Sequence, residues 1–278
     1  MRYPGGKTAL ANLIIALRRL NGLGHTSLAE PFAGGAGASL KLLFLEETRK
    51  IFINDLDSSI HDFWWSILHR PNMFFRRLKE TEITIEEWRR QREIYRSIDR
   101  KSRINNGFSA FYLNRCNRSG IIMNGGPIGG YSQSGSWKID ARFNPDDLLK
   151  RCKKIYDYKD RIEVSCCDGI KFIANRSGSD TFLFIDPPYF YKGSKLYLNS
   201  LSERYHVDLS LEIKKHEHTN WILTYDDCEE IRDLYSGWAN LTPFHLQYSA
   251  SRKRKGREIL ITPLWMKIPT KIENYLCN

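Results

Sequence analysis

The chain has 278 residues, 41% hydrophobic and 27% charged, a composition typical of globular domains and not of disordered or fibrous chains. Lys and Arg number 43 against 32 Asp and Glu, and the net charge of +11 favours a polyanionic partner. No apolar run approaches the roughly 20 residues of a membrane span, and no N-terminal apolar segment indicates a secretory signal. Six cysteines without CxxC spacing predict neither a metal site nor a disulfide framework, so we expect a reducing cytoplasm and no membrane.

The first 70 residues alternate short apolar runs with amphipathic segments, which predicts an α/β fold. We expect a strand over 27–30 that ends at a glycine-rich turn, followed by a helix over 38–47. A second strand over 50–54 and a helix over 58–69 come next.

The segment 71–143 has a different character and is predicted to be an insertion in the α/β core. Residues 71–102 are highly charged and helical in period, with Trp88 and Ile94 on one apolar face. Residues 108–115 connect this charged segment to a glycine-rich one. The six glycines between Gly120 and Gly135 predict a loop or an irregular β-hairpin.

The core pattern resumes after this segment. We expect helices over 145–158, 169–175, 206–216 and 228–235, and strands over 162–165, 181–186 and 220–225. Residues 242–248 and 258–264 flank a basic run and would form a terminal antiparallel pair.

The first motif is a glycine-rich turn between a strand and a helix, with the sequence EPFAGGAG over 30–37. Its glycines allow a tight turn and a close approach of the backbone to a ligand. Asp55 ends the next strand, where a carboxylate can accept hydrogen bonds from ribose hydroxyls. The pair predicts an adenosine-containing cofactor, either a dinucleotide or S-adenosylmethionine.

The second motif, Asp186-Pro187-Pro188-Tyr189, directly follows the apolar run TFLFI. Ligands of open α/β sheets bind beyond the carboxyl ends of strands. The Asp186 carboxylate and a carbonyl of the rigid proline turn would accept hydrogen bonds from both hydrogens of a planar amino group. The ring of Tyr189 would stack on the base that carries this amino group.

These acceptors predict methyl transfer to an exocyclic amino group. The lone pair of the adenine amino nitrogen is delocalised into the ring, and accepting both N–H groups favours a localised lone pair. Such hydrogen bonds strengthen as positive charge develops on the nitrogen in the transition state. A target within a duplex must first be flipped out of the helix.

In their order along the chain, RYPGGK, EPFAGGAG, the acidic residue of FINDLD and DPPY resemble the motifs of Dam-like DNA adenine methyltransferases, in the alpha group of amino-methyltransferases. The matches run from Arg2 to about Ile261. The resemblance implies a Rossmann-like S-adenosylmethionine-dependent methyltransferase sheet with a terminal antiparallel hairpin and a mainly helical inserted DNA-recognition domain. Residues 1–70 and 144–278 would form the catalytic domain, and 71–143 the inserted target-recognition domain.

The resemblance also implies the cofactor and its ligands. S-adenosylmethionine would be bound by the N-terminal motif, the glycine motif and three carboxylates, with Asp55 on the ribose and Asp168 near the adenine. The cofactor-binding residues would be Tyr3, Lys7, Glu30, Pro31, Phe32, Gly34, Gly35, Gly37, Asp55, Asp168 and Asp186. Tyr3 and Pro4 stand where relatives often carry Trp and Ala.

By the same resemblance, the inserted segment enters DNA. Arg115, Arg118 and Ser119 would contact phosphates, while base contact or wedging would fall to Tyr131, Gln133, Trp137 and Lys138. The basic run Arg252, Lys253, Arg254 and Lys255 resembles the family's basic loop before the last strand. Extra glycines around Pro127 depart from the family, so its recognition sequences do not transfer to this chain.

The resemblance thus implies a site-specific methyltransferase that acts on N6 of a flipped adenine in double-stranded DNA. An RNA adenine methyltransferase would use the same cofactor and catalytic residues, and an N4-cytosine DNA methyltransferase would meet a similar amino group. An inactive DNA-binding module would not need an intact DPPY, and a dehydrogenase would leave DPPY unexplained. A cognate restriction endonuclease is a candidate partner, and we expect a monomer or weak dimer in bacterial or phage-infected cytoplasm.

Overall fold

The computed structural model describes residues 1, 7–97, 102–190, 202–248 and 254–276, with side chains outside 246–256. It contains a seven-stranded sheet in the order β3-β2-β1-β4-β5-β7-β6. The strands are β1 (Ser27–Glu30), β2 (Ile51–Asn54), β3 (Ile162–Ser165), β4 (Thr181–Ile185), β5 (Asn220–Asp226), β6 (Ala239–Tyr248) and β7 (Arg254–Pro263). The helices are α1 (Ala11–Leu20), α2 (Gly37–Phe44), α3 (Ser58–His69), α4 (Pro71–Glu80), α5 (Ile85–Arg96), α6 (Arg103–Cys116), α7 (Pro145–Asp157), α8 (Gly169–Arg176), α10 (Glu203–Lys215) and α11 (Glu229–Tyr235).

The strand pairing confirms the predicted α/β fold with a terminal antiparallel hairpin. β1 pairs in parallel with β2 and β4, and β4 pairs in parallel with β5. β7 runs antiparallel to β5 and to β6, so the hairpin β6–β7 extends this edge of the sheet. Within the described residues, none of the helices is long and apolar enough to span a membrane.

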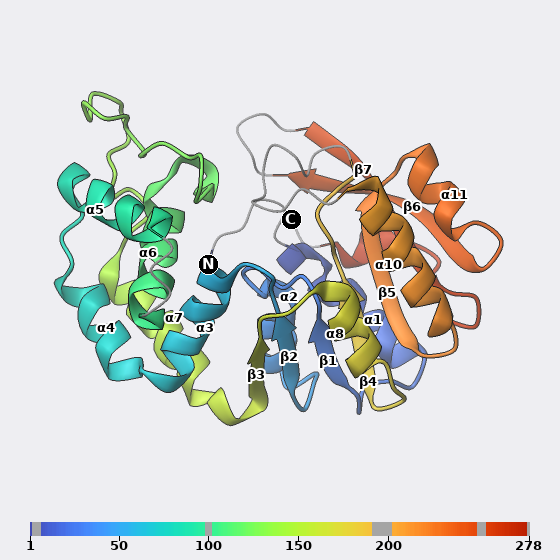
Figure 1. Cartoon of the computed structure of the whole chain (residues 1–278). Helices are drawn as coiled ribbons and strands as arrows, with labels where there is room; N and C mark the ends of the chain where they lie inside the picture. Colours follow the sequence, from blue (N-terminus) through green and yellow to red (C-terminus); the bar gives the residue numbers. More distant parts are fainter. Residues whose placement is uncertain (2–6, 98–101, 191–201, 249–253, 277–278) are drawn as a thin grey trace. The chain divides into compact units, whose positions relative to one another are not determined.

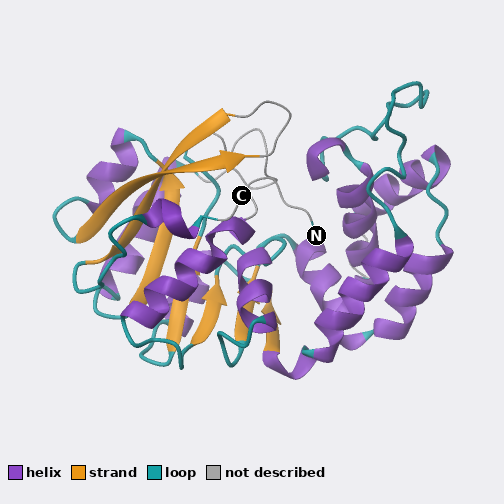
Figure 2. Ribbon diagram, turned by 180° about the vertical axis from the view of Figure 1, so that it is seen from behind, coloured by secondary structure: helices purple, strands orange, loops and turns teal. Residues whose placement is uncertain are grey.

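The chain order places a topological switch point between β1 and β4. From β1 the chain crosses through α2 to β2 on one side, whereas from β4 it crosses through α10 to β5 on the other. Such crossovers are right-handed, so crossovers that move in opposite directions put their helices on opposite faces. Figures 1 and 2 show α8 and α10 on one face of β4 and β5, with α1 and α2 on the other.

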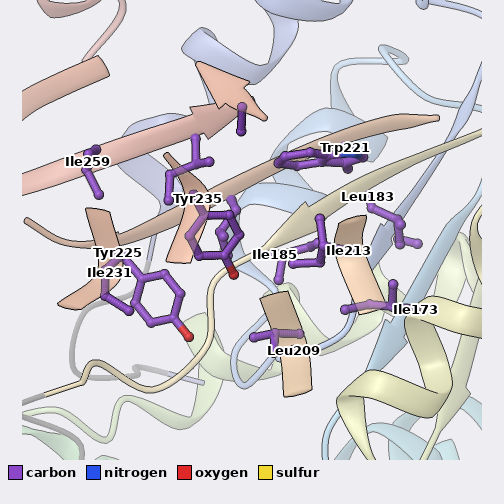
Figure 3. Packing of buried hydrophobic residues seen from close by; sticks show 14 of the residues in the cluster. Ile173, Leu183, Ile185, Leu209, Ile213, Trp221, Tyr225, Ile231, Tyr235 and Ile259 are labelled. Atoms are coloured by element: carbon purple, nitrogen blue, oxygen red, sulfur yellow. The ribbon is translucent and has the colours of Figure 1, made fainter. Parts of the chain in front are cut away.

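The main apolar core lies between β4, β5, β7 and the helices α8, α10 and α11. Alternate residues of β4 and β5, such as Leu183, Ile185 and Tyr225, point to this side, where Ile173 and Leu209 meet them (Figure 3). Successive side chains of a strand point to opposite faces, so the continuous burial of β4 and β5 means that both faces of these strands are covered. The buried strands fix the positions of the loops that leave their carboxyl ends.

Several helices begin where the sequence supplies a capping side chain or a proline. Asp57 accepts a hydrogen bond from the backbone N of Ser59 at the start of α3, and Thr84 accepts one from Glu87 at the start of α5. Pro71 and Pro145 stand at the beginnings of α4 and α7. Side-chain oxygens at these positions satisfy backbone N–H groups that have no partner in the helix.

The helix α1 has no counterpart in the predictions. Its residues Leu13, Ile14 and Leu17 are buried at helical spacing, but Leu10 precedes it without a capping hydrogen bond. Arg18 is also buried and donates to the backbone oxygens of Glu47 and Thr26, both at 2.5 Å. Burial lowers the pKa of this guanidinium to about 10.

The chain divides into two compact units, one of residues 1–4 and 57–166 and the other of 5–56 and 167–278. These bounds differ from the expected insertion over 71–143, because α3 packs on α6 through Phe63 and Phe111, whose rings stack at 5.5 Å. The charge change at residue 71 marks the start of a new helix. A recognition role for 71–143 remains a prediction.

The structure adds detail to two expectations for the middle segment, since it divides the helical stretch and shows a loop where a loop or an irregular β-hairpin was expected. The helical period over 71–102 is broken at 81–84 into α4 and α5, where Thr84 caps the second helix. Residues 117–140 contain no strand among the described residues and form one isolated bridge, between Asn117 and Pro127. Outside this segment, α2 ends at Phe44 and not at the expected residue 47, and Glu46 adopts a φ of 58°.

Gly107 allows the close approach of α6 to α3. A Cβ atom on Gly107 would lie 2.4 Å from the carbonyl carbon and oxygen of Asp62, which are backbone atoms that cannot rotate away. We therefore expect Gly107→Ala to lower the free energy of unfolding by about 2 kcal/mol, as overpacking does. Urea unfolding would measure this change. Gly126→Ala, where a Cβ meets nothing within 4 Å, is the matched control, and equal effects of both variants would contradict the prediction.

Candidate active site

The predicted motif residues gather at the carboxyl ends of the two strands that flank the switch point. β1 ends at Glu30 and leads into the glycine-rich turn, while Asp186 directly follows β4. Ala29 of β1 is in register with Leu183 of β4. Crevices at this place are where open α/β sheets bind ligands.

The glycine-rich turn is held by backbone geometry and by Asp55. Gly34 adopts a φ of 48°, which favours glycine, and its N–H donates to Asp55 Oδ2 at 2.9 Å. A Cβ on Gly37 would lie 2.2 Å from Thr8 Oγ1, so a larger residue there would force the Thr8 side chain to rotate.

Glu30 is buried behind this turn. Its Oε1 accepts a hydrogen bond from the backbone N of Ser39 at 3.0 Å, which ties β1 to α2. Burial raises the pKa of the Glu30 carboxyl to about 7, the hydrogen bonds of Ser39 lower it, and the charge of Asp186 raises it further. Glu30 therefore serves the loop architecture in this structure.

Asn54, which sequence reasoning missed, connects two loops at the same edge. Its Nδ2 donates to the backbone oxygens of Pro31 and Cys167 at 2.9 and 2.8 Å, and its Oδ1 accepts from Cys167 N at 3.0 Å. The side chain is buried at the end of β2. A polar residue in the final buried position of a predicted strand was the signal available in the sequence.

Phe32 and the start of α8 lie against each other. A Cβ on Gly169 would lie 2.4 Å from the Phe32 ring, so only glycine permits this contact. Asp168 Oδ1 accepts from the backbone N atoms of Ile170 and Lys171, and Oδ2 accepts from Tyr205 Oη at 2.9 Å. Asp168 thus caps α8, and burial raises the pKa of Tyr205 above its usual range.

Asp186 is bound on one oxygen by two donors. Thr224 Oγ1 donates to Asp186 Oδ1 at 2.7 Å, and Lys7 Nζ lies 3.0 Å from the same atom. The Asp186 side chain is 20% exposed, whereas that of Lys7 is 4% exposed. Both contacts hold the carboxylate of the predicted catalytic loop in one orientation.

Tyr189 is held through its hydroxyl. Lys7 Nζ donates to Tyr189 Oη at 2.6 Å and lies 4.7 Å from the ring centroid, at the hydroxyl end of the side chain. The hydroxyl in turn donates to Glu258 of β7. Pro187 is buried and Pro188 is half-buried. The structure thus brings Lys7 of the N-terminal motif to the DPPY loop, whereas Lys7 was expected from the sequence to bind the cofactor.

Buried polar groups also support the end of this loop. The backbone N of Phe190 donates to Asp226 Oδ1 at 3.1 Å. The Phe190 ring lies 5.1 Å from that of His206, which hydrogen-bonds Tyr225 Oη at 2.6 Å. Burial lowers the pKa of His206 and raises that of Tyr225.

The expected phosphate-binding residues have different surroundings. Arg115 donates through Nε and Nη2 to the backbone oxygen of Arg142 at 2.9 and 2.6 Å, which fixes the end of α6 to the segment before α7. Arg118 and Ser119 are exposed. Ser119 has a φ of 56° within a short helical turn.

The expected base-contact residues lie in the glycine-rich loop. Gln133 Nε2 donates to the backbone oxygens of Ile128 and Gly130 at 2.8 and 2.6 Å, and its Oε1 accepts from Ile139 N at 2.8 Å. The Gln133 amide therefore binds the loop itself, and Lys138 donates to the Gln133 backbone oxygen. Trp137 is 73% exposed.

Tyr131, from the same loop, is anchored at its edge. Its ring meets that of Trp88 at 5.6 Å, and buried Trp88 donates through Nε1 to Asn117 Oδ1 at 2.6 Å. Tyr131 nevertheless remains 56% exposed. The loop thus presents two large aromatic rings on a scaffold that its own polar side chains hold.

The remaining expected residues lie at the ends of the described segments. Tyr3, Arg252 and Lys253 fall outside the described residues. Arg254 and Lys255 contribute backbone to β7, where they pair with Tyr248 and Gln247. The described residues hold no group of three or more His, Cys, Asp or Glu side chains arranged to bind a metal ion.

Comparison with known proteins identifies one family over most of the chain. The family model for D12 class N6 adenine-specific DNA methyltransferases matches residues 3–250. No curated protein sequence matches the chain significantly.

Two solved structures are similar at low identity. A Pyrococcus horikoshii protein, PH1948, provisionally titled an RNA methyltransferase, is 9% identical with a TM-score of 0.39, over 94% of this chain and 84% of its own. The rRNA methyltransferase aviRa from Streptomyces viridochromogenes is 11% identical with a TM-score of 0.36, over 91% of this chain and 82% of its own. Similarity this weak carries no inference about substrate.

The raised pKa of Glu30 predicts a pH dependence of stability. The folded chain holds the Glu30 proton up to about pH 7, whereas an unfolded chain releases it near its ordinary value of 4.5. Because the unfolded state binds fewer protons in this window, rising pH favours unfolding. The shift corresponds to about 3 kcal/mol.

Glu30→Gln removes this titration. We expect the free energy of unfolding of the native chain, relative to Glu30→Gln, to fall by about 3 kcal/mol between pH 4.5 and pH 7. Urea titrations of both proteins across this range would measure the difference. Parallel curves would show that Glu30 is ionised in the fold.

Proposed function

Since the chain belongs to the family of D12 class N6 adenine-specific DNA methyltransferases, we propose that it transfers a methyl group from S-adenosylmethionine to N6 of an adenine flipped out of duplex DNA. One observation carries this proposal: Asp186 of DPPY lies directly after β4, beside the glycine-rich turn that follows β1, at the switch point of the sheet.

The two oxygens of Asp186 have different tasks in this proposal. Oδ1 receives Lys7 and Thr224, which fix the carboxylate plane. Oδ2 and a backbone oxygen of the proline turn accept the two N–H groups of the adenine amino group. These acceptors favour a localised nitrogen lone pair and stabilise positive charge as the new bond forms.

The cofactor-binding residues fit an adenosine-containing molecule. The Gly34 turn brings backbone close to a ligand at the end of β1, and the Phe32 ring against Gly169 offers an apolar wall. Asp55 holds the turn and would present its carboxylate to ribose hydroxyls. When bound, S-adenosylmethionine supplies a methyl group activated by a sulfonium, so the protein mainly orients the reactants.

Tyr189 would hold the flipped base by stacking. Lys7 and Glu258 hold the Tyr189 hydroxyl, so the ring would be kept in place for this contact. Aromatic stacking of an extrahelical base is sequence-tolerant, and the selection of adenine falls to the hydrogen bonds at its amino edge.

The loop 117–140 would contact duplex DNA through its exposed groups. Arg118 and Ser119 would reach phosphates, whereas Trp137 and Tyr131 offer rings to wedge between bases. Gln133 instead holds the loop, because its amide is bound to backbone groups. Arg115 likewise supports the fold of this unit.

The decisive test of the reaction uses Asp186. We expect Asp186→Ala to abolish methyl transfer and to change affinity for S-adenosylmethionine by less than about tenfold, because the carboxylate acts on the amino group. Thr224→Val, which removes one hydrogen bond to Oδ1, should lose about tenfold in turnover. Turnover would be measured with radiolabelled cofactor, and binding by calorimetry.

The same assay identifies the substrate. Duplex DNA, single-stranded DNA and RNA are offered in parallel, and modified positions are mapped by sequencing. N6-methyladenine in duplex DNA supports the proposal, whereas methylation of RNA or of cytosine N4 assigns one of the rival activities. Near-normal turnover by Asp186→Ala would refute the catalytic role.

The DNA contacts predict two different salt responses. Arg118→Ala should weaken binding and reduce the slope of log affinity against log salt by about 1, because one phosphate contact is lost. Trp137→Ala should weaken binding about tenfold at every salt concentration, because a stacking ring carries no charge. Fluorescence anisotropy with the mapped site measures both. Trp265→Ala, which removes another exposed tryptophan, is the control, and equal loss there would contradict a specific role for Trp137.

A further inference from the structure

Glu258 is a buried carboxylate on β7 that no catalytic or binding motif of the sequence includes. Its side chain is 2% exposed. The backbone at Glu258 pairs with Asp226 of β5 on one side and Phe244 of β6 on the other. A residue between two ladders in a sheet has little freedom to move, so its carboxylate is a fixed point.

The side-chain contacts of Glu258 lead to the catalytic loop. The Tyr189 hydroxyl donates to Glu258 Oε1, and Lys7 Nζ lies 3.8 Å from the same oxygen. Lys7 is in turn 3.0 Å from Asp186 Oδ1. One buried ammonium is thus shared by two carboxylates, and the Tyr189 hydroxyl joins the group.

Charge sharing matters for the acceptor strength of Asp186. An ammonium that is paired with a single carboxylate withdraws electron density from that carboxylate. The carboxylate is then a weaker acceptor for further hydrogen bonds. With Glu258 present, Lys7 orients Asp186 while a second negative charge offsets its field. A buried carboxylate is costly without a paired cation, so Glu258 also keeps Lys7 within the cluster.

We propose that Glu258 is a positioning residue for methyl transfer, which acts through Lys7 and Tyr189 to hold the DPPY loop and to preserve the acceptor strength of Asp186. This inference rests on the proposed function. It also gives Lys7, one of the expected cofactor-binding residues, a role in holding the DPPY loop.

The kinetic test separates positioning from binding. Glu258→Ala should reduce kcat about 100-fold, as a misplaced reacting group does, with the KM for S-adenosylmethionine within about threefold. Glu258→Gln keeps an oxygen for the Tyr189 hydroxyl but removes the charge, and should retain about tenfold more activity than Glu258→Ala. A general loss of folding would raise KM and lower thermal stability together.

A double-mutant cycle tests the route through Tyr189. Tyr189→Phe keeps the ring for stacking and deletes the hydroxyl that donates to Glu258. If Glu258 acts through this hydroxyl, Glu258→Ala costs less kcat in the Tyr189→Phe background than in the native chain. Strict additivity of the two effects would overturn this route.

Hydrogen exchange tests, without any substrate, whether Glu258 holds the DPPY loop through Tyr189 and Lys7. We call this set of contacts the brace. We expect Glu258→Ala to accelerate amide exchange in a peptide that covers 184–190, because the loop loses the hydrogen bond from Tyr189, and Lys7 loses one of its two carboxylate partners. Asp227→Asn is the matched control, since Asp227 is another carboxylate with a 2% exposed side chain, and it pairs with Arg232 and Arg257.

The outcomes distinguish this inference from the proposed function. Faster exchange only in Glu258→Ala supports the brace even where the methylated substrate proves to be RNA. Unchanged exchange, or an equal change in Asp227→Asn, overturns it. Native kcat in Glu258→Ala overturns it as well, while Asp186→Ala still reports on the reaction.

Discussion

Two adjacent parallel strands whose crossovers leave on opposite faces set the places of the glycine-rich turn and of DPPY. Because β1 and β4 are neighbours, Glu30 and Asp186 emerge side by side at the one edge where no crossover helix closes the sheet between them. The glycine turn and the DPPY loop are 150 residues apart in sequence, by the difference between positions 36 and 186, yet strand pairing alone brings them together. The motif order therefore becomes a spatial arrangement without any help from the loops.

Electrostatics then differentiates the acidic groups at that edge. Glu30 is desolvated and holds its proton to about pH 7, Asp55 and Asp168 are tied to backbone N–H groups, and Asp186 is paired with Lys7. These four carboxyl groups have similar intrinsic chemistry. Their surroundings give them different roles. Glu30 is buried and protonated, Asp55 and Asp168 hold a loop and a helix start, and Asp186 forms an ion pair.

The sequence was most informative where local chemistry decides structure. The strands before the glycine turn and before DPPY follow from apolar runs with turn residues after them, and the α3 start follows from its Asp57 cap. α1 escaped prediction because Leu10 supplies no cap and no acidic residue stands in its first turn. The boundary at residue 71 was misplaced because α3 buries its aromatic face on α6, a tertiary contact.

The site shows the same division. Asp186 and Asp55 could be predicted from their positions at strand ends, whereas Asn54 and Glu258 depend on partners more than 60 residues away, at Cys167 and Tyr189. Gln133 was expected as a candidate for base contact or wedging because its segment resembles the family's DNA-entering segment. Its amide folds back on Ile128 and Ile139, and no sequence pattern distinguishes an inward amide from an outward one.

The Gln133 clamp has a consequence for molecular association. A loop that is ordered in the free protein has already lost the backbone conformational entropy that a flexible segment loses on binding. The three hydrogen bonds of Gln133, together with those of Asn117, offset this entropy cost when the chain folds. If Trp137 contacts DNA as proposed, its binding would therefore cost less backbone entropy than contact through a flexible segment.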